Sequence, residues 1–335
     1  MDEDQKPDTE AAAFNRLSPD EILNAVESRG IQCDGRLLAL NSYENRVYQV
    51  GLEEQAPVIV KFYRPMRWSD DAILEEHAFT LALFEREIPV VPPIVDGEGA
   101  TLHHYGPYRF SFYERRGGRS PELDNPQHLE QLGRFIGRIH AMSEVQSFSY
   151  RPTLNTEHFA VDSYQFLLEA GFIPTELQVA YRTLSEDLIT RVEACFARSG
   201  KARLIRLHGD CHPGNILWTD AGPHIVDFDD ARMGPAIQDL WMFLSGDRSY
   251  MTERLADMLE GYTAFRNFDS RELHLIEALR TLRMMHYAAW LARRWDDPAF
   301  PRAFPWFNSV RYWEEHILSL REQAALLDEH PLIWE

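Results

Sequence analysis

Apolar and polar residues alternate in short runs over the first third of the chain, with the period of two that is typical of β-strands. Five such runs occur, at 36–40, 46–50, 58–63, 102–105 and 108–114. Between the third and fourth runs, Ser69 begins a stretch with helical spacing of apolar residues that continues to about Glu87. The pattern predicts a small β-rich unit that contains one helix.

The pattern changes after Gly117-Gly118, where helical spacing begins to dominate. A helix is predicted from Asn125-Pro126 to about Ser143, and a β-rich island at 204–230 interrupts the helical region. Near the other end of the chain, Ser18 followed by Pro19 and Glu21 is typical of a capped helix start. We therefore expect an α+β protein in three parts: an acidic disordered tail (1–15), a β-rich N-lobe (16–116) and a mostly helical C-lobe (117–335).

The strongest chemical signal is the segment HGDCHPGN at 208–215, a loop between two strand-like runs. Asp210 and Asn215 have the spacing of the kinase pattern H-x-D-x-x-x-x-N, in which the aspartate is the base and the asparagine is a metal ligand. Alternate His and Asp residues also resemble a hydrolase metal site. Pro213-Gly214 favours a loop, however, and the hydrolase interpretation leaves Asn215 without a role.

A second acidic site follows a short strand at 224–226 and begins with Asp227. A strand–turn–strand hairpin between Asn215 and Asp227 would bring both side chains to the same end. Kinases hold magnesium with such an aspartate, and magnesium prefers oxygen ligands. We therefore expect Asp227 to be both a catalytic residue and a metal ligand, with Asn215 as the second ligand.

A kinase also needs a cation for the nucleotide phosphates, and Lys61 lies alone in an apolar strand. A buried charge requires a partner, and the helix that follows offers Glu75 and Glu76. We prefer Glu76 and expect a change at Glu75 to be almost neutral. Either glutamate, taken alone, is equally compatible with a solvated helix face.

Two other segments are candidates for the nucleotide site. The turn at 41–45 lacks the glycine-rich pattern of protein kinases, but Ser42 could bind phosphate oxygens. The run at 110–114 precedes Gly117-Gly118 and is the expected hinge, where Phe112 and Glu114 would offer backbone groups to adenine.

Composition limits the possible partners. The 335 residues carry a net charge of −19, from 53 acidic and 34 basic side chains, which argues against a nucleic-acid or anionic-membrane binder. Three widely spaced cysteines do not form a disulfide framework, and no run approaches the roughly 20 apolar residues of a spanning helix. The N-terminus is acidic rather than signal-like. We expect a cytoplasmic monomer.

Taken together, these motifs resemble the aminoglycoside phosphotransferase and choline kinase branch of the kinase superfamily, and within it the bacterial stress response kinase A family. The similar segments are 40–48, 60–65, 207–218, 239–241 and 289–295. The resemblance implies a two-lobed kinase-like fold, ATP and Mg²⁺, protein Ser/Thr acceptors and protection against envelope and oxidative stress. It also implies Asp210 as proton acceptor, Asn215 and Asp227 as magnesium ligands and Ser42 in the ATP site.

Two other functions remain open. A small-molecule kinase for an aminoglycoside, choline or a homoserine-like alcohol would use the same motifs, and a non-catalytic nucleotide-binding scaffold would have no need of them all. The chain also departs from protein kinases. Gly209 replaces the arginine that grips an activation-loop phosphate, and 230–238 contains no Ser, Thr or Tyr. We therefore expect no switch by activation-loop phosphorylation.

Overall fold

The computed structural model describes residues 12 and 14–334, which form two compact units. Unit 1 contains the chain up to 121 together with 149–151 and 214–229, and unit 2 contains 122–148, 152–213 and the chain from 230 onward. Most of the predicted acidic tail, 1–11 and 13, lies outside the described residues. Phe14, near the end of that predicted tail, is buried in a helical turn and packs into the core of unit 1.

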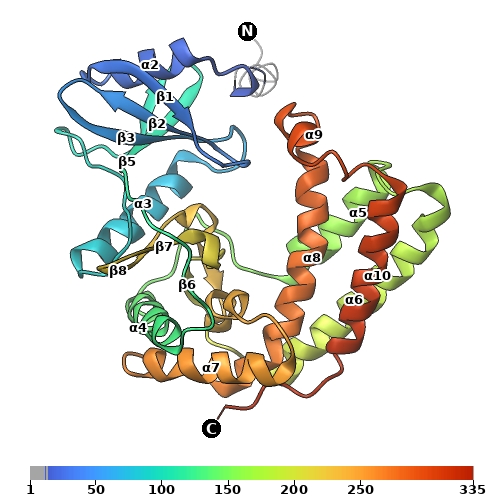
Figure 1. Cartoon of the computed structure of the whole chain (residues 1–335). Helices are drawn as coiled ribbons and strands as arrows, with labels where there is room; N and C mark the ends of the chain where they lie inside the picture. Colours follow the sequence, from blue (N-terminus) through green and yellow to red (C-terminus); the bar gives the residue numbers. More distant parts are fainter. Residues whose placement is uncertain (1–11, 13, 335) are drawn as a thin grey trace. The chain divides into compact units, whose positions relative to one another are not determined.

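Unit 1 is built on a five-stranded antiparallel sheet with the strand order β1-β2-β3-β5-β4 (Figure 1). Its strands are β1 (Cys33–Ala39), β2 (Arg46–Leu52), β3 (Gln55–Phe62), β4 (His103–Tyr105) and β5 (Tyr108–Glu114). All five predicted runs are therefore strands, with ends that differ by up to three residues. The difference is largest where the polar ends of β1 and β3 pair with their neighbours.

The two faces of this sheet have different neighbours. One face carries Val58, Val60 and Phe62 and packs against helix α2 (Pro19–Glu27) to form the core of unit 1. Ser18 caps α2 with the predicted capping box, and Pro19 is its first residue. The opposite face carries Lys61 and lies against helix α3 (Asp70–Glu85), to which the Tyr63 hydroxyl is joined by a hydrogen bond with His77.

A β-hairpin from a distant part of the sequence also belongs to unit 1. Its strands β7 (Ile216–Thr219) and β8 (Gly222–Ile225) pair in register from Ile216 opposite Ile225. Bridges from Val90 to Ile225 and from Arg119 to Trp218 join this hairpin to the rest of the unit. The sequence prediction placed the hairpin with the C-lobe, and these bridges are the physical reason for the difference.

Unit 2 consists mostly of helices. They are α4 (Pro126–Ser143), α5 (Asp162–Glu169), α6 (Gln178–Ser199), α7 (Arg248–Thr263), α8 (Ile276–Arg293), α9 (Ala299–Ala303) and α10 (Val310–Leu326). The backbones of helices α4 and α7 are in direct contact at Gly133. A Cβ atom at this position would lie 1.9 Å from the Met258 carbonyl oxygen, so a larger residue would not fit. The predicted helix from Pro126 to Ser143 is confirmed, as is the α+β fold class.

A two-stranded sheet in unit 2 pairs β6 (Ile205–Leu207) with β9 (Arg232–Gly234). The sequence pattern did not predict β9, because its three residues are too few to show alternation. Residues 231–240 are all buried. Within the described part of the chain, no helix combines the length and apolar character needed to cross a membrane.

Candidate active site

Lys61 lies in β3 of unit 1 with only 7 % of its surface exposed. Its Nζ atom is 2.9 Å from Oδ1 of Asp227 and 3.1 Å from Oδ1 of Asp229. Burial alone would lower the pKa of Lys61, but the charges of these two carboxylates outweigh it and hold the pKa above its usual range. The lysine therefore stays charged, as a phosphate-binding cation must.

The hairpin brings Asn215 and Asp227 to the same end, as predicted. Val226 N donates a hydrogen bond of 3.0 Å to the carbonyl oxygen of Asn215, directly beyond the last pair of the ladder. Asp227 has a φ of +62°, which is unusual for a residue with a side chain, and its side chain is 53 % exposed. The turn therefore places a carboxylate beside Lys61 on a residue with a strained backbone. Strained backbone conformations are common at functional sites.

Asp229 is a second carboxylate that sequence reasoning did not place in the site. It is buried, and it contacts Arg67 as well as Lys61. Arg67 also lies 3.7 Å from the carboxylate of Glu44 in the β1–β2 turn. The acidic turn after β8 is thus held by two cations of unit 1. The run of three aspartates at 227, 229 and 230 was the available signal, but it does not tell which of them is buried.

The partner of Lys61 differs from the predicted one. Glu76 is buried in α3 with 3 % exposure, yet among the described residues it makes no direct ion pair with Lys61, whose carboxylate partners are Asp227 and Asp229. Burial raises the pKa of Glu76 to about 7, and the nearby charges of Lys61 and Arg151 limit the rise. Glu76 is therefore an electrostatic neighbour of Lys61, and the direct pair is formed by the acidic turn.

Glu75 is not the neutral surface residue that we expected. Its carboxylate accepts hydrogen bonds from the backbone N–H groups of Ser149, Tyr150 and Arg151, at 2.6, 2.8 and 2.9 Å. The expectation was wrong because the helical pattern shows which positions point to the core, but not which distant loop meets the opposite side of the helix.

The turn at 41–45 joins β1 to β2, as predicted, and contains a half-buried Ser42. Arg64 holds this turn from the end of β3. Its guanidinium donates to the carbonyl oxygens of Glu44 at 2.8 Å and Tyr43 at 3.2 Å, and Asn45 accepts a hydrogen bond from Arg64 N. The turn therefore has a fixed backbone although it lacks glycines.

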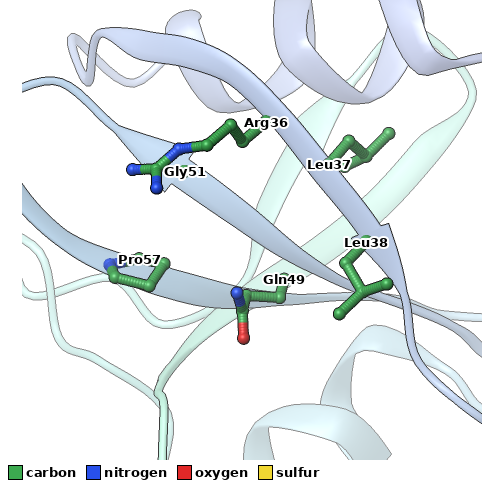
Figure 2. A pocket seen from close by; sticks show the side chains of 6 residues that line it. All are labelled: Arg36, Leu37, Leu38, Gln49, Gly51 and Pro57. Atoms are coloured by element: carbon green, nitrogen blue, oxygen red, sulfur yellow. The ribbon is translucent and has the colours of Figure 1, made fainter.

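A pocket of about 110 Å³ opens on the sheet of unit 1 (Figure 2). Its lining comes from β1, β2 and β3: Arg36, Leu37, Leu38, Gln49, Gly51 and Pro57. The register places Gln49 opposite Ile59, two residues before Lys61, so the Gln49 side chain lies on the Lys61 face. Leu38 is paired with Gln49 on the same face and is 56 % exposed. This surface combines the apolar side chain of Leu38 with the polar side chains of Gln49 and Arg36.

The predicted hinge residues differ in what they can offer. Phe112 has its ring in the core of unit 1, and its carbonyl oxygen accepts a hydrogen bond from Ile94 N at 2.7 Å. Glu114 is the exposed last residue of β5 and is paired with Arg116. Arg115, the next residue, donates to the Gln49 amide at 2.7 Å and so joins the hinge segment to the pocket.

Asp210 belongs to unit 2, in a loop that begins after β6. Asp239 anchors this loop by accepting hydrogen bonds from the N–H groups of His208 and Gly209, both at 2.8 Å. His140 contacts the same carboxylate at 3.1 Å, so Asp239 is itself held in place. The segment 239–241 belongs to the resemblance, but its residue types do not predict this structural role of Asp239.

The carboxylate of Asp210 has basic partners. Arg283 of α8 donates to Oδ1, and His212 Nε2 lies 3.5 Å from Oδ2. Burial alone would raise the pKa of Asp210, but the hydrogen bond from His212 and the charge of Arg283 outweigh it and hold the pKa well below its usual range. Asp210 is therefore ionised at neutral pH.

Gly209 has a structural reason to be glycine. Its φ is +85°, and a Cβ atom would lie 2.1 Å from the carbonyl oxygen of Asp230. Arg232 occupies the space beside it and donates to the same carbonyl oxygen at 2.8 Å. No side chain can project from this position to bind an activation-loop phosphate.

A kinase site must also be able to hold a metal ion. Among the described residues, no three His, Cys, Asp or Glu side chains are grouped as a metal site. Mg²⁺ does not need such a group, because it is usually held by one or two carboxylates together with substrate phosphates and water. Asn215 and the exposed carboxylate of Asp227 fit that requirement.

Relatives with known names match almost the whole chain. A protein called stress response kinase A from Escherichia coli O157:H7 is 45 % identical over 322 residues, which cover 96 % of this chain and 97 % of the relative. A serine/threonine protein kinase called RdoA from Salmonella typhimurium is 44 % identical with the same coverage. The predicted resemblance to the stress response kinase A family is confirmed.

Solved structures of kinases share the fold. Amicoumacin kinase in complex with AMP-PNP, Ca²⁺ and Ami aligns with a TM-score of 0.71 at 21 % identity, and the alignment covers 93 % of this chain and 95 % of the kinase. Choline kinase from Cryptosporidium parvum aligns with a TM-score of 0.60 at 12 % identity, covering 92 % and 96 %. The kinase-like fold is confirmed, and the sequence pattern of the "Phosphotransferase enzyme family" matches residues 36–276. The chain is a kinase and belongs to the phosphotransferase enzyme family.

Proposed function

We propose that this kinase transfers the γ-phosphoryl group of ATP to the hydroxyl group of serine or threonine in proteins. The hydroxyl oxygen forms a bond to the γ-phosphorus while the bond from that phosphorus to the β,γ-bridging oxygen breaks, and ADP leaves. The carboxylate of Asp210 accepts the hydroxyl proton. Its ionised state in the free protein supports this role.

We propose that Asn215 and Asp227 hold Mg²⁺ at the end of the β7–β8 hairpin. The ion, when bound, neutralises charge on the β- and γ-phosphates. Lys61 contributes a second positive charge on the same side of the unit, 2.9 Å from the Asp227 carboxylate. Ser42 in the β1–β2 turn offers a hydroxyl group to phosphate oxygens.

We place the adenine base over the pocket on the Lys61 face, between Leu38 and the hinge segment. The backbone of this segment from Glu114 onward, rather than Phe112, supplies the hydrogen bonds to adenine. The contact between Arg115 and Gln49 supports this location, since it places the hinge segment at the edge of the pocket.

The observation that carries the choice of acceptor is the pair of basic side chains on Asp210. A cationic acceptor would meet the positive charge of Arg283 at the base, and like charges repel. The structural neighbours include kinases named for amicoumacin, aminopropanol and choline, so a small alcohol is the second candidate. The name of the relative from Salmonella favours a protein acceptor.

A panel of acceptors tests the proposal. Labelled ATP is supplied with a casein-type protein mixture in one arm and with small alcohols, including choline and an aminoglycoside, in the other. We expect label in Ser or Thr of protein and none in the small alcohols, with transfer abolished by Asp210→Asn. Label in a small alcohol alone would replace the acceptor assignment, and no transfer at all would favour a nucleotide-binding scaffold.

We also propose a cytoplasmic role in a stress response, by analogy with the names of the relatives. The structure contains three cysteines without a disulfide, which fits a reducing compartment. A deletion strain that loses viability under oxidative or envelope stress, and regains it with the intact gene but not with the Asp210→Asn variant, would support this role.

A further inference from the structure

The contact between Glu75 and the segment 149–151 is a polar contact in unit 1 that the proposed reaction does not use. Both carboxylate oxygens of Glu75 are occupied by three successive N–H groups, at 2.6–2.9 Å. Hydrogen bonds to an ionised acceptor are shorter and stronger than neutral ones. Glu75 therefore fixes the backbone of this segment, and with it the starting point of the Arg151 side chain.

Arg151 extends from that segment to the acidic turn. It is 5 % exposed, and its guanidinium donates to the carbonyl oxygens of Asp229 at 3.1 Å and Phe228 at 3.4 Å. The guanidinium also lies over the ring of Trp68, 4.4 Å from its centre. These contacts hold the backbone of the two residues that follow Asp227.

The turn needs such support. Asp227 has a left-handed backbone with φ +62°, which costs a residue with a side chain free energy and persists only when the surroundings impose it. Its own side chain is 53 % exposed, so packing of that side chain does not impose the conformation. The ring of Phe228 packs edge-on against Phe79 of α3, which anchors the next residue from the side.

We infer that Glu75 and Arg151 are positioning residues for the metal-binding turn. Glu75 fixes segment 149–151, Arg151 fixes the carbonyl groups of Phe228 and Asp229, and the strained Asp227 is thereby held in the orientation that receives the metal. This inference deepens the proposed function and rests on it for the role of Asp227 as a metal ligand. It gives helix α3 a connection to the metal site that is separate from the charge of Glu76.

Two conservative variants test the inference. Glu75→Gln keeps the size of the side chain, but its amide nitrogen cannot accept the N–H groups that a carboxylate oxygen accepts. Arg151→Lys keeps the charge but cannot donate to two carbonyl groups in the same fork geometry. Glu85→Gln, at an exposed position near the end of the same helix, is the matched control.

The first measurement is backbone hydrogen exchange of peptides covering 226–231, in the full-length chain without metal. We expect exchange to be about tenfold faster in Glu75→Gln and in Arg151→Lys, and unchanged in Glu85→Gln. Peptides from β3 and α2 should be unaffected in all three variants. Unchanged exchange at 226–231 in both variants would overturn the positioning role. Equal acceleration over the whole of unit 1 would also overturn it, since that result shows general destabilisation.

The second measurement is Mn²⁺ binding, followed by electron paramagnetic resonance, in the presence of a non-hydrolysable ATP analogue. We expect a Kd about tenfold higher for Glu75→Gln and Arg151→Lys than for the parent chain, with nucleotide affinity in the absence of metal unchanged. Parent-like Mn²⁺ binding by both variants contradicts the inference. If the parent itself binds no Mn²⁺ with nucleotide, the proposed metal site fails, and the exchange measurement still decides whether the turn is positioned.

Discussion

Lys61 and Asp227 are 166 positions apart in the sequence, yet Nζ of the lysine lies 2.9 Å from Oδ1 of the aspartate within unit 1. The strand that carries Lys61 and the turn that carries Asp227 each place one charge at this point. Because the aspartate is half exposed and the lysine is buried, the carboxylate can turn toward a metal while the lysine stays in place. The pair joins the cation that we propose for the phosphates to the carboxylate that we propose for the metal.

Removal of this cation should impair nucleotide use. We expect Lys61→Met to lower kcat/KM for ATP by about 10²-fold, the usual effect of losing one charged group aimed at developing negative charge. The fold should survive, since Asp229 keeps its contact with Arg67. Lys201→Met, at an exposed site in unit 2, is the control. Parent-like ATP kinetics in Lys61→Met would remove Lys61 from the site.

The raised pKa of Glu76 should make the stability of the protein depend on pH. Burial raises its pKa to about 7, from an ordinary value near 4.5, so the folded state keeps a proton that the unfolded state loses. The resulting stabilisation is complete below about pH 4.5 and is lost as the pH rises through 7. Glutamine imitates the protonated form. Between pH 5 and pH 8, we therefore expect the free energy of unfolding to fall less in Glu76→Gln than in the parent.

The test of this prediction is urea unfolding at both pH values, with Glu85→Gln as the control. The free energy of unfolding could instead change by the same amount in Glu76→Gln and in the parent. That result would show that Glu76 is ionised in the folded state throughout this pH range.

Arg283 helps to keep Asp210 ionised. Burial alone would raise the pKa of Asp210, but the hydrogen bond from His212 and the charge of Arg283 hold it low, so the carboxylate stays ionised down to acidic pH. We expect Arg283→Met to raise the pKa of Asp210 and to move the acidic limb of the kcat/KM profile upward by roughly one pH unit. Arg321→Met, at an exposed position on α10, should leave the profile in place. An unshifted acidic limb in Arg283→Met contradicts this account.

The enzyme should not need phosphorylation for activity. Gly209 cannot carry a side chain, and the residues at 231–238 are buried and contain no hydroxyl group on Ser, Thr or Tyr. We expect phosphatase-treated enzyme to show no lag, with a rate within about a few-fold of untreated enzyme. The measurement is a progress curve at fixed ATP and acceptor. A lag that disappears after pre-incubation with ATP would reveal an activation step.

Local sequence patterns predicted much of the fold and the main chemical groups. The loop at 208–215 and the strand containing Lys61 are short segments. Few sites other than those of kinases combine these residue types at this spacing. The helix starts at Ser18 and Ser69 were also predictable, because capping depends on residues within one turn. These features depend on residues that are close together in the sequence, so the sequence alone is enough to predict them.

The remaining features depend on residues far apart in sequence. Arg283 is 73 positions from Asp210, and Glu75 is 74 positions from Ser149, so no local pattern indicates either contact. The choice between Glu75 and Glu76 depends on the rotation of α3 against the sheet. The buried Glu76 lies near Lys61, while the half-buried Glu75 meets segment 149–151. Such tertiary contacts cannot be read from periodicity alone.

Single-turnover phosphotransfer by the Asp210→Asn variant tests the central claim most directly. Enzyme in excess over labelled ATP is mixed with saturating protein acceptor, and transfer is followed by rapid quench beside equilibrium binding of ATP. The account predicts a transfer rate at least 10²-fold below that of the parent, because the amide cannot accept the proton, with the Kd for ATP changed by less than about threefold. A transfer rate in Asp210→Asn close to that of the parent would contradict the assignment of Asp210 as the catalytic base.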